Sequence, residues 1–339
     1  MGYASPVAER TPRALLVGAG SLGRAVLRRL RDRESPVTLV GVTTGHQGTL
    51  MAADGVEAGQ ALVQLETEGL PDETPAFEEL LEKVAPEVVL ECIPQNIRSA
   101  EPALGMHRLC LDRGIHVVTA NKAPVALAYR DLRERAQARG VQLRFEATIL
   151  DGLPLFRWFR AMPDVRIDRV RGILNATSSM VLESVGEGGT RARGLARAQA
   201  RGIAEADSIL DLDGWDAAAK AALLANVWMD GSLRVVDVKR SGCDQLKDKK
   251  IQEAAEGGLR HRLVVTVERG EAGPLARVEP EALKDSDPLY GFPGSRGAVT
   301  VTTDQGTATT LVQTTSGLDD AAFGMISDVR AIRAGLPPV

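Results

Sequence analysis

The start of the chain joins a short apolar segment, a glycine-rich turn and a helix-forming segment, and this order restricts the possible folds. Residues 13–17 form an apolar run that predicts a strand, and residues 24–30 carry apolar side chains at helical spacing. The turn between them consists of Gly18, Ala19, Gly20, Ser21, Leu22 and Gly23. In such a turn the first glycine makes the bend, the second lets a pyrophosphate approach, and the third lets helix and strand pack closely. The free N–H groups at the start of the helix would face the phosphates, so the turn predicts a dinucleotide site more than an ordinary loop.

Strands and helices alternate over the following hundred residues or so. Further strands are predicted at residues 37–43, 88–92, 116–119 and 142–147, and helices at 101–113 and 132–139, the last ended by Gly140. Strands that alternate with helices indicate a parallel, doubly wound sheet. The fold class is therefore expected to be α/β, with an N-terminal Rossmann dinucleotide-binding domain.

The pattern changes after about residue 146, which predicts a second domain. A chain of 339 residues is long enough for two. Strands are expected at 165–174, 263–268, 298–303 and 308–314, the last two forming a hairpin, and helices at 178–187, 193–201, from about Asp213, and at about 319–332. The predicted domains are residues 1–146 and 147–318, the second of α/β (α+β) type, with the terminal helix (about 319–339) returning to the first domain.

Composition and charge exclude several classes of partner. The net charge is −4 and the basic residues are scattered among acids, so neither nucleic acid nor an anionic membrane is an expected partner. The three cysteines and four histidines lack the spacing of a disulfide framework or a structural zinc site. With no run of 18 apolar residues and no signal-peptide pattern, the protein is expected to be soluble and cytoplasmic.

One lysine lies within a segment that is otherwise apolar. Between residues 217 and 228, Lys220 is the only ionisable side chain, which predicts a buried helix with a lysine retained for chemistry or reaching to water. Asp216 lies four residues earlier, on the same helix face. Four further carboxylates precede it, at Glu205, Asp207, Asp211 and Asp213. The alternative is structural: an ordinary surface ion pair, with Asp213 and Asp216 as helix-capping acids.

The end of the second predicted strand bears on the choice of cofactor. NAD-specific sites usually place a carboxylate there, but this chain has Thr43, Thr44, Gly45 and His46. The absence of an acid favours NADP over NAD, although the sequence offers no clear arginine for the 2′-phosphate.

Three motifs, in order and at matching spacing, resemble the homoserine dehydrogenase family along the whole chain. They are Val117-Val118-Thr119-Ala120-Asn121-Lys122-Ala123-Pro124; Asn175-Ala176-Thr177; and Gly202-Ile203-Ala204-Glu205-Ala206-Asp207 followed by Asp211, Gly214, Asp216 and Lys220. The chain is most similar to the short members without a regulatory tail. The resemblance implies a Rossmann domain joined to a substrate-binding and dimerisation domain, a homodimer, and the NAD(P)-dependent interconversion of homoserine and aspartate 4-semialdehyde, a small-molecule substrate.

The same resemblance assigns residues to roles. Lys220 would be the main acid/base, Lys122 a second lysine at the reacting centre, and Asp216 a partner that orients the lysines. The substrate would contact Glu205, Asp211, Thr177 and Asp216. The cofactor would contact the glycine turn with Thr43 and Thr44, and Pro94, Asn96, Thr119, Asn121 and Gly317.

Lysine suits this chemistry, because oxidation of an alcohol removes a hydroxyl proton together with a hydride. Burial and a second lysine would lower the pKa of Lys220, and nearby carboxylates would raise it, so the sequence leaves the balance open.

The family resemblance also implies a sodium-like cation. Its ligands would be Glu146, Ile149, Asp151 and Leu153, mostly through oxygen atoms of the backbone. A strand followed by a tight loop, without a cation, is the alternative.

The departures from the family pattern fall among residues that would line the substrate pocket. They are Leu150-Asp151 in place of glycines, Ala176 and Ser178-Ser179-Met180 in the second motif, Ile203 in place of a tyrosine, and Thr315-Ser316-Gly317-Leu318. Such changes alter substrate preference more than reaction class. Two alternatives therefore stay open: an oxidoreductase of a related hydroxy-amino acid, and an NAD(P)-binding sensor with inactive chemistry.

Overall fold

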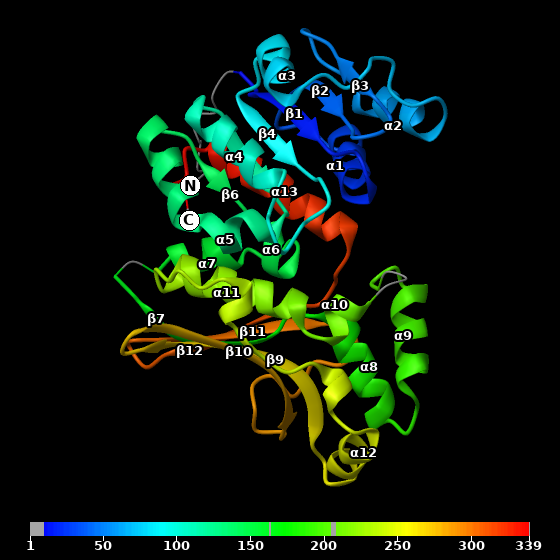
Figure 1. The fold of residues 1–339 in the computed structure, drawn as a ribbon, viewed down its shortest axis with the longest axis vertical. Helices are drawn as coiled ribbons and strands as arrows, with labels where there is room; N and C mark the ends of the chain where they lie inside the picture. Colours follow the sequence, from blue (N-terminus) through cyan, green and yellow to red (C-terminus); the bar gives the residue numbers. More distant parts are fainter. Residues whose placement is uncertain (1–9, 163, 205–207, 339) are drawn as a thin grey trace, which may run out of the picture. The chain divides into compact units, whose positions relative to one another are not determined.

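The computed structural model describes residues 10–162, 164–204 and 208–338 and contains two compact α/β units. The first comprises residues 1–157 and 318–339, and the second residues 158–317. Each unit is built on a six-stranded sheet with helices (Figure 1). The predicted α/β fold class is confirmed.

The sheet of the first unit has the strand order β3-β2-β1-β4-β5-β6, which is the doubly wound order of dinucleotide-binding domains. Its strands are β1 (Arg13–Val17), β2 (Thr38–Thr43), β3 (Thr49–Met51), β4 (Val88–Glu91), β5 (His116–Thr119) and β6 (Leu143–Arg144). All neighbouring strands are parallel except β2 and β3. The central strands β1, β4 and β5 are almost fully buried, as expected for a parallel sheet with both faces covered.

Among the described residues, eight helices lie wholly or partly in this unit. They are α1 (Ser21–Asp32), α2 (Ala58–Glu66), α3 (Phe77–Val84), α4 (Ala103–Asp112), α5 (Lys122–Arg139), α6 (Ala147–Leu150), α7 (Leu155–Arg160) and α13 (Leu318–Arg333). The C-terminal helix α13 packs against α1, and Met325 and Val329 join the core with strand residues of the sheet. Gly140 ends α5 in the left-handed conformation, as the sequence predicts.

The chain around Glu146 differs from the predicted strand at 142–147. The strand covers only Leu143–Arg144, and Ala147–Leu150 is a helical turn. The reason is tertiary: the Glu146 N–H donates to the Asp328 carboxylate, and the Glu146 side chain accepts N–H groups from Phe156 and Arg157. These bonds also keep the segment up to Arg157 within the first unit, so the unit boundary lies beyond the expected residue 146.

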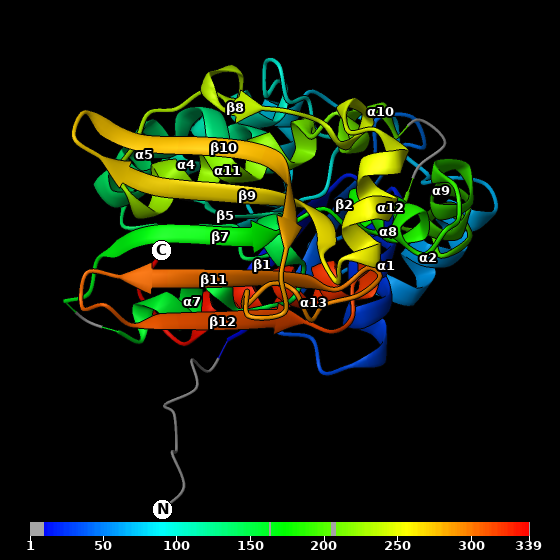
Figure 2. The ribbon, with the colours of Figure 1, turned by 90° about the horizontal axis from the view of Figure 1, so that it is seen from below.

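The second unit has a mainly antiparallel sheet of order β12-β11-β7-β9-β10-β8, whose strands lie side by side in Figure 2. Its strands are β7 (Ile167–Ile173), β8 (Lys239–Arg240), β9 (Arg260–Gly270), β10 (Gly273–Leu283), β11 (Gly297–Thr303) and β12 (Ala308–Gln313). The predicted hairpin is confirmed as β11 and β12. Strand β10 was not predicted, because Pro274, Pro280 and several charges break its alternation; it is held by pairing with β9 along its whole length.

The helices of the second unit are α8 (Ala176–Gly186), α9 (Arg191–Ala200), α10 (Ile209–Leu212), α11 (Trp215–Trp228) and α12 (Asp248–Glu256), with short 3-10 turns at Val235–Asp237 and Cys243–Gln245. Helix α11 packs on β9 and β10 and is buried on nearly all sides. It begins at Trp215 after a left-handed Gly214, and no side chain caps it. The capping alternative for Asp213 is therefore wrong. Within the described parts of the chain, no helix is long and apolar enough to cross a membrane.

Candidate active site

The three glycines of the turn in the first unit differ in how closely they are packed. Gly18 has a φ of +92°, and a Cβ there would lie 2.7 Å from the carbonyl carbon of Cys92. A Cβ on Gly23 would lie 2.0 Å from the carbonyl oxygen of Gly18, so the helix and the turn touch there. A Cβ on Gly20 would meet no atom within 4 Å. Gly18 and Gly23 are therefore required by packing, whereas Gly20 leaves open space at the start of α1, where Ser21 and Leu22 form the first turn.

The loop after β2 contains threonines held by the protein itself. The Thr43 and Thr49 hydroxyls lie 2.8 Å apart, and the Thr44 hydroxyl accepts the N–H of Gln47 at 2.6 Å. Arg24 of α1 reaches this loop: its Nη2 donates to the Gln47 side chain at 3.2 Å and to the carbonyl of Leu65 at 3.0 Å. The sequence offers no clear arginine for a 2′-phosphate; in the structure, the Arg24 side chain contacts the loop after β2.

The carboxyl ends of β4 and β5 carry the predicted residues of the nicotinamide end. Thr119 ends β5 and is fully buried, and Asn121 caps α5, which begins with Lys122. Pro94 and Asn96 lie on the loop after β4, where the Asn96 Oδ1 accepts the N–H groups of residues 98 and 99. Ligands of doubly wound sheets bind at this edge.

Two buried residues near the same edge, Glu91 and His107, were not singled out from the sequence. The Glu91 carboxylate ends β4 with no exposed surface, and it accepts hydrogen bonds from Thr119 and His107. The only sequence signal was an acid at the end of an otherwise apolar strand.

The predicted residues of the second unit that lie in the described chain come together around Lys220. The Lys220 Nζ donates to the carbonyl oxygen of Leu174 at 2.5 Å and lies 3.3 Å from the Asp216 Oδ2. The Asn175 Nδ2 donates to the Asp211 Oδ1 at 2.8 Å and to the Asp216 Oδ2 at 3.2 Å. One amide thus bridges two carboxylates, one of which holds the lysine, so the lysine and both acids form one polar cluster.

Local structure explains this cluster. Asn175 is the N-cap of α8, where its Oδ1 accepts the N–H of Ser178 at 2.8 Å, so its Nδ2 faces the acids. Thr177 is buried and hydrogen-bonds Asp211. Burial, and then the nearby Asp216 charge, raise the pKa of Asp211, opposed by the bonds from Asn175 and Thr177. Glu205 and Asp207 lie outside the described residues. Gly317, with φ +144°, directly precedes α13.

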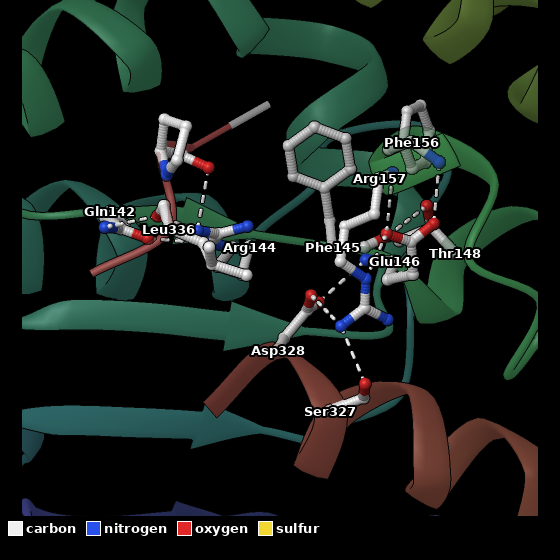
Figure 3. Close-up of polar contacts among 11 residues, drawn as sticks. Gln142, Arg144, Phe145, Glu146, Thr148, Phe156, Arg157, Ser327, Asp328 and Leu336 are labelled. Atoms are coloured by element: carbon white, nitrogen blue, oxygen red, sulfur yellow. Dashed lines mark hydrogen bonds and ion pairs between the residues drawn. The ribbon is translucent and has the colours of Figure 1, made fainter. Parts of the chain in front are cut away.

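Beside the loop proposed for a cation, two buried carboxylates, Glu146 and Asp328 of α13, lie close to the Arg157 guanidinium (Figure 3). Glu146 accepts the N–H of Phe156 at 2.7 Å and pairs with the Arg157 Nε at 3.2 Å, and Asp328 accepts the Glu146 N–H at 2.9 Å. Burial, and then the charge of Asp328, raise the pKa of Glu146 to about 7, and burial raises the pKa of Asp328 to about 6.

The charge balance of this loop bears on whether a cation fits. The two carboxylates pair with the Arg157 guanidinium, and the charge of Arg144 also acts on Asp328. Burial nevertheless raises the pKa of both carboxyl groups, so a bound proton or a monovalent cation would stabilise the cluster. Ile149, Asp151 and Leu153 lie on the adjoining turn and offer backbone carbonyls. Among the described residues, no group of three or more His, Cys, Asp and Glu side chains could hold a metal ion.

A doubly wound sheet with a dinucleotide turn, followed by a unit with a partly buried lysine among carboxylates, is the arrangement of a two-domain NAD(P)-dependent oxidoreductase. Comparison with known proteins narrows this class. The model of the homoserine dehydrogenase family matches residues 154–329, and the model of the homoserine dehydrogenase NAD-binding domain matches residues 18–146. The chain belongs to the homoserine dehydrogenase family, whose members oxidise or reduce a hydroxyl-bearing carbon with NAD(P).

Individual relatives agree with this assignment. A homoserine dehydrogenase of Sulfurisphaera tokodaii is 30% identical over 322 residues, which cover 93% of this chain and 96% of the relative. An NAD(+)-dependent homoserine dehydrogenase of Pseudomonas canavaninivorans is 30% identical over 330 residues, covering 93% and 94%. The crystal structure of homoserine dehydrogenase from Thermoplasma acidophilum is similar with a TM-score of 0.82 and 25% identity, covering 95% of this chain and 98% of that one. The resemblance stated from the motifs is thus confirmed.

Proposed function

We propose that this protein interconverts L-homoserine and L-aspartate 4-semialdehyde, with Lys220 as the acid/base. The observation that carries the proposal is the Lys220 ammonium held at 3.3 Å from Asp216 on an apolar, buried helix. A charged side chain is found in such apolar surroundings where it has an ion-pair partner and a functional role. NAD(P) supplies the hydride acceptor or donor when it is bound.

The residues of the second unit account for the movement of the proton. In oxidation the C–H hydride leaves the alcohol carbon for the cofactor, and the neutral Nζ of Lys220 takes the hydroxyl proton, which leaves an aldehyde. In reduction the ammonium returns that proton to the oxygen. The Leu174 carbonyl and Asp216 fix the position of the Nζ atom. Lys122, the first residue of α5, is proposed as the second lysine because of its sequence motif.

The acids around Lys220 suit the amino end of the substrate. Asp211, with Glu205, would receive the α-ammonium group through charge-assisted hydrogen bonds, and Thr177 would add a hydroxyl contact. Asn175 supports this role, because its Nδ2 holds Asp211 and Asp216 in place. Asp216 thus orients Lys220 and borders the same substrate site.

We further propose that NADP is preferred over NAD. No carboxylate lies between residues 43 and 48 to repel a 2′-phosphate, and the Arg24 guanidinium reaches this loop. The relative from Pseudomonas canavaninivorans is named as NAD(+)-dependent, so the preference for NADP is a proposal for the present chain alone.

The chain is also proposed to bind a monovalent cation such as sodium through Glu146 and the carbonyls of Ile149, Asp151 and Leu153. The burial of the Glu146 and Asp328 carboxyl groups, which raises the pKa of both, supports this. We expect a soluble, cytoplasmic homodimer, as the composition and the family resemblance imply, which light scattering on the purified protein would test.

Initial rates of NADP⁺ reduction test the substrate. We expect kcat/KM for L-homoserine to exceed that for L-serine and L-threonine by about 100-fold, because the site is matched to one chain length. The second candidate function, oxidation of a related hydroxy-amino acid, is favoured by Ile203 and Asp151, which depart from the family pattern. Equal or higher activity on another hydroxy-amino acid would establish that alternative in place of homoserine.

A further inference from the structure

A fully buried carboxylate at the carboxyl edge of the first sheet takes no part in the chemistry described above. Glu91 has 0% exposure at the end of β4. Its Oε1 accepts the N–H of Ile93 at 2.8 Å. Its Oε2 accepts the hydroxyl of Thr119 at 2.7 Å and lies 3.1 Å from the Nε2 of His107. A buried charge persists only with such partners, and three donors satisfy this one.

The Glu91 carboxylate determines the direction of its hydrogen bond with the Thr119 hydroxyl. An ionised carboxylate only accepts, so the Thr119 hydroxyl must donate its proton to Glu91. The lone pairs of the Thr119 Oγ1 are then available, and one accepts the backbone N–H of Asn121 at 2.8 Å. Glu91 therefore fixes the backbone of Asn121 through one intervening hydroxyl.

Asn121 in turn holds the first residues of α5 in place. Its Oδ1 accepts the N–H of Ala123 at 3.2 Å and caps the helix that begins with Lys122. With Oδ1 facing the helix, the Nδ2 group is the donor left over. This Nδ2 is buried and finds no acceptor in the described part of the chain. Because a buried donor without an acceptor is destabilising, its acceptor is expected on a bound ligand.

The other oxygen of Glu91 organises a second loop. The bond from Ile93 shapes the turn that leads to Pro94 and Asn96. This turn packs on the glycine turn, since a Cβ on Gly18 would lie 2.8 Å from the backbone nitrogen of Ile93. Glu91 thus joins the loops that follow β1, β4 and β5, which is the edge where dinucleotides bind.

We propose that Glu91 is a positioning residue for the nicotinamide end of the cofactor. It sets the hydroxyl of Thr119 and thereby Asn121, whose Nδ2 donates to the carboxamide oxygen of the nicotinamide. This inference rests on the proposed function only in that the ligand is NAD(P). It assigns Glu91 no contact with the adenine half.

The Glu91→Gln variant tests the proposal by binding. Glutamine keeps the size but places a donor opposite the Ile93 N–H or the Thr119 hydroxyl. We expect the affinity for NADPH, measured by calorimetry, to fall by about tenfold or more, as for loss of a hydrogen bond to a charged group. The affinity for 2′,5′-ADP, which lacks the nicotinamide half, should stay within about twofold, since the glycine turn and Arg24 are unchanged.

Two further variants separate positioning from general stability. Thr119→Val removes the connecting hydroxyl at constant size and should reproduce the NADPH-specific loss. The double variant, Glu91→Gln with Thr119→Val, should bind NADPH no more weakly than the weaker-binding single variant, because both substitutions act through one chain of hydrogen bonds. His107→Gln keeps a donor to the same carboxylate oxygen but touches neither loop, so it should leave the ratio of the two affinities unchanged.

The outcomes are distinct. Equal weakening of NADPH and 2′,5′-ADP by Glu91→Gln, or no weakening of either, overturns the proposal. If Glu91→Gln does not fold, Thr119→Val decides alone, and an unchanged affinity ratio in that variant overturns it too. These measurements need no turnover. An NADPH-specific loss in a protein that proves inactive on homoserine would refute the proposed substrate and leave the assignment of Glu91 standing.

Discussion

The Nζ atom of Lys220 lies 3.3 Å from the Oδ2 atom of Asp216, one turn earlier on α11. Their side chains are 13% and 15% exposed. Asn175 donates to the same Asp216 oxygen, so the carboxylate binds the lysine and is itself held. A largely buried ion pair of this kind is sensitive to loss of one partner, because the other charge is then left uncompensated.

The raised pKa of Asp211 predicts a pH dependence of stability. The folded state binds its proton more tightly than the unfolded state, so the free energy of unfolding falls as the pH rises from the ordinary aspartate value through the raised one. Asp211→Asn lacks this titration, and its free energy of unfolding should fall less between about pH 4 and pH 7. Urea unfolding at several pH values measures this.

Asp237 provides a control of opposite sign. Hydrogen bonds from exposed Arg234 lower the pKa of Asp237 to about 2. Its contribution to stability is present above the ordinary aspartate pKa and is lost as the pH falls towards the lowered value. Because the ion pair with Arg234 is exposed, this contribution is small, and Asp237→Asn should change stability little at neutral pH. Identical pH profiles for the wild type and Asp211→Asn would contradict the account of Asp211.

The glycine turn predicts opposite outcomes for two Gly→Ala substitutions. A Cβ on Gly23 would lie 2.0 Å from a backbone oxygen, so Gly23→Ala should lower the free energy of unfolding by at least about 1–3 kcal/mol. Gly20 has space for a methyl group, so Gly20→Ala should fold normally yet bind NADPH about tenfold more weakly, because the methyl occupies the approach of the pyrophosphate. Thermal unfolding and calorimetry check both. Unchanged NADPH affinity in Gly20→Ala would argue against the site.

The position of Arg24 predicts cofactor discrimination. Arg24→Gln should lower kcat/KM for NADP⁺ by about tenfold or more while changing that for NAD⁺ little, since only NADP⁺ carries the 2′-phosphate. Arg31→Gln is the matched control, because this arginine lies on the same helix and pairs with Asp32 at the surface. An equal loss of kcat/KM with both cofactors would show that Arg24 stabilises the loop and does not bind the 2′-phosphate.

The two buried carboxyl groups at Glu146 and Asp328 predict an effect of sodium. The thermal midpoint should be a few degrees higher in sodium chloride than in choline chloride of equal ionic strength, since a ligand that binds only the folded state stabilises it. Glu146→Gln removes the charged ligand and should abolish the difference. Equal thermal midpoints of the wild type in the two salts would contradict the proposal that the folded protein binds sodium.

Much of the fold could be predicted because its strands and helices are either uniformly buried or simply patterned. Strands β1, β4 and β5 are read as apolar runs, and α11 as an apolar helix with one charge. Strand β10 could not be predicted, because its prolines and charges obscure a pairing supplied by β9.

The site was predictable in part for a similar reason. Asp216 and Lys220 share a helix, so their spacing alone places them together. Arg24 and Glu91 act on partners that lie 23 and 28 residues away, at Gln47 and Thr119, and only the pairing of strands shows these contacts. Residue type and spacing therefore indicated the lysine and its acids, but not the groups that organise the cofactor loops.

Replacement of Lys220 by methionine tests the central claim most directly. The rate of NADPH formation at saturating L-homoserine should fall by about 100- to 10,000-fold, as for loss of a general base, while the dissociation constant for NADPH stays unchanged. Lys249→Met, at an exposed position of α12, should keep the wild-type rate. A Lys220→Met protein that binds NADPH and retains more than about a tenth of the rate would contradict the assignment of Lys220 as the acid/base.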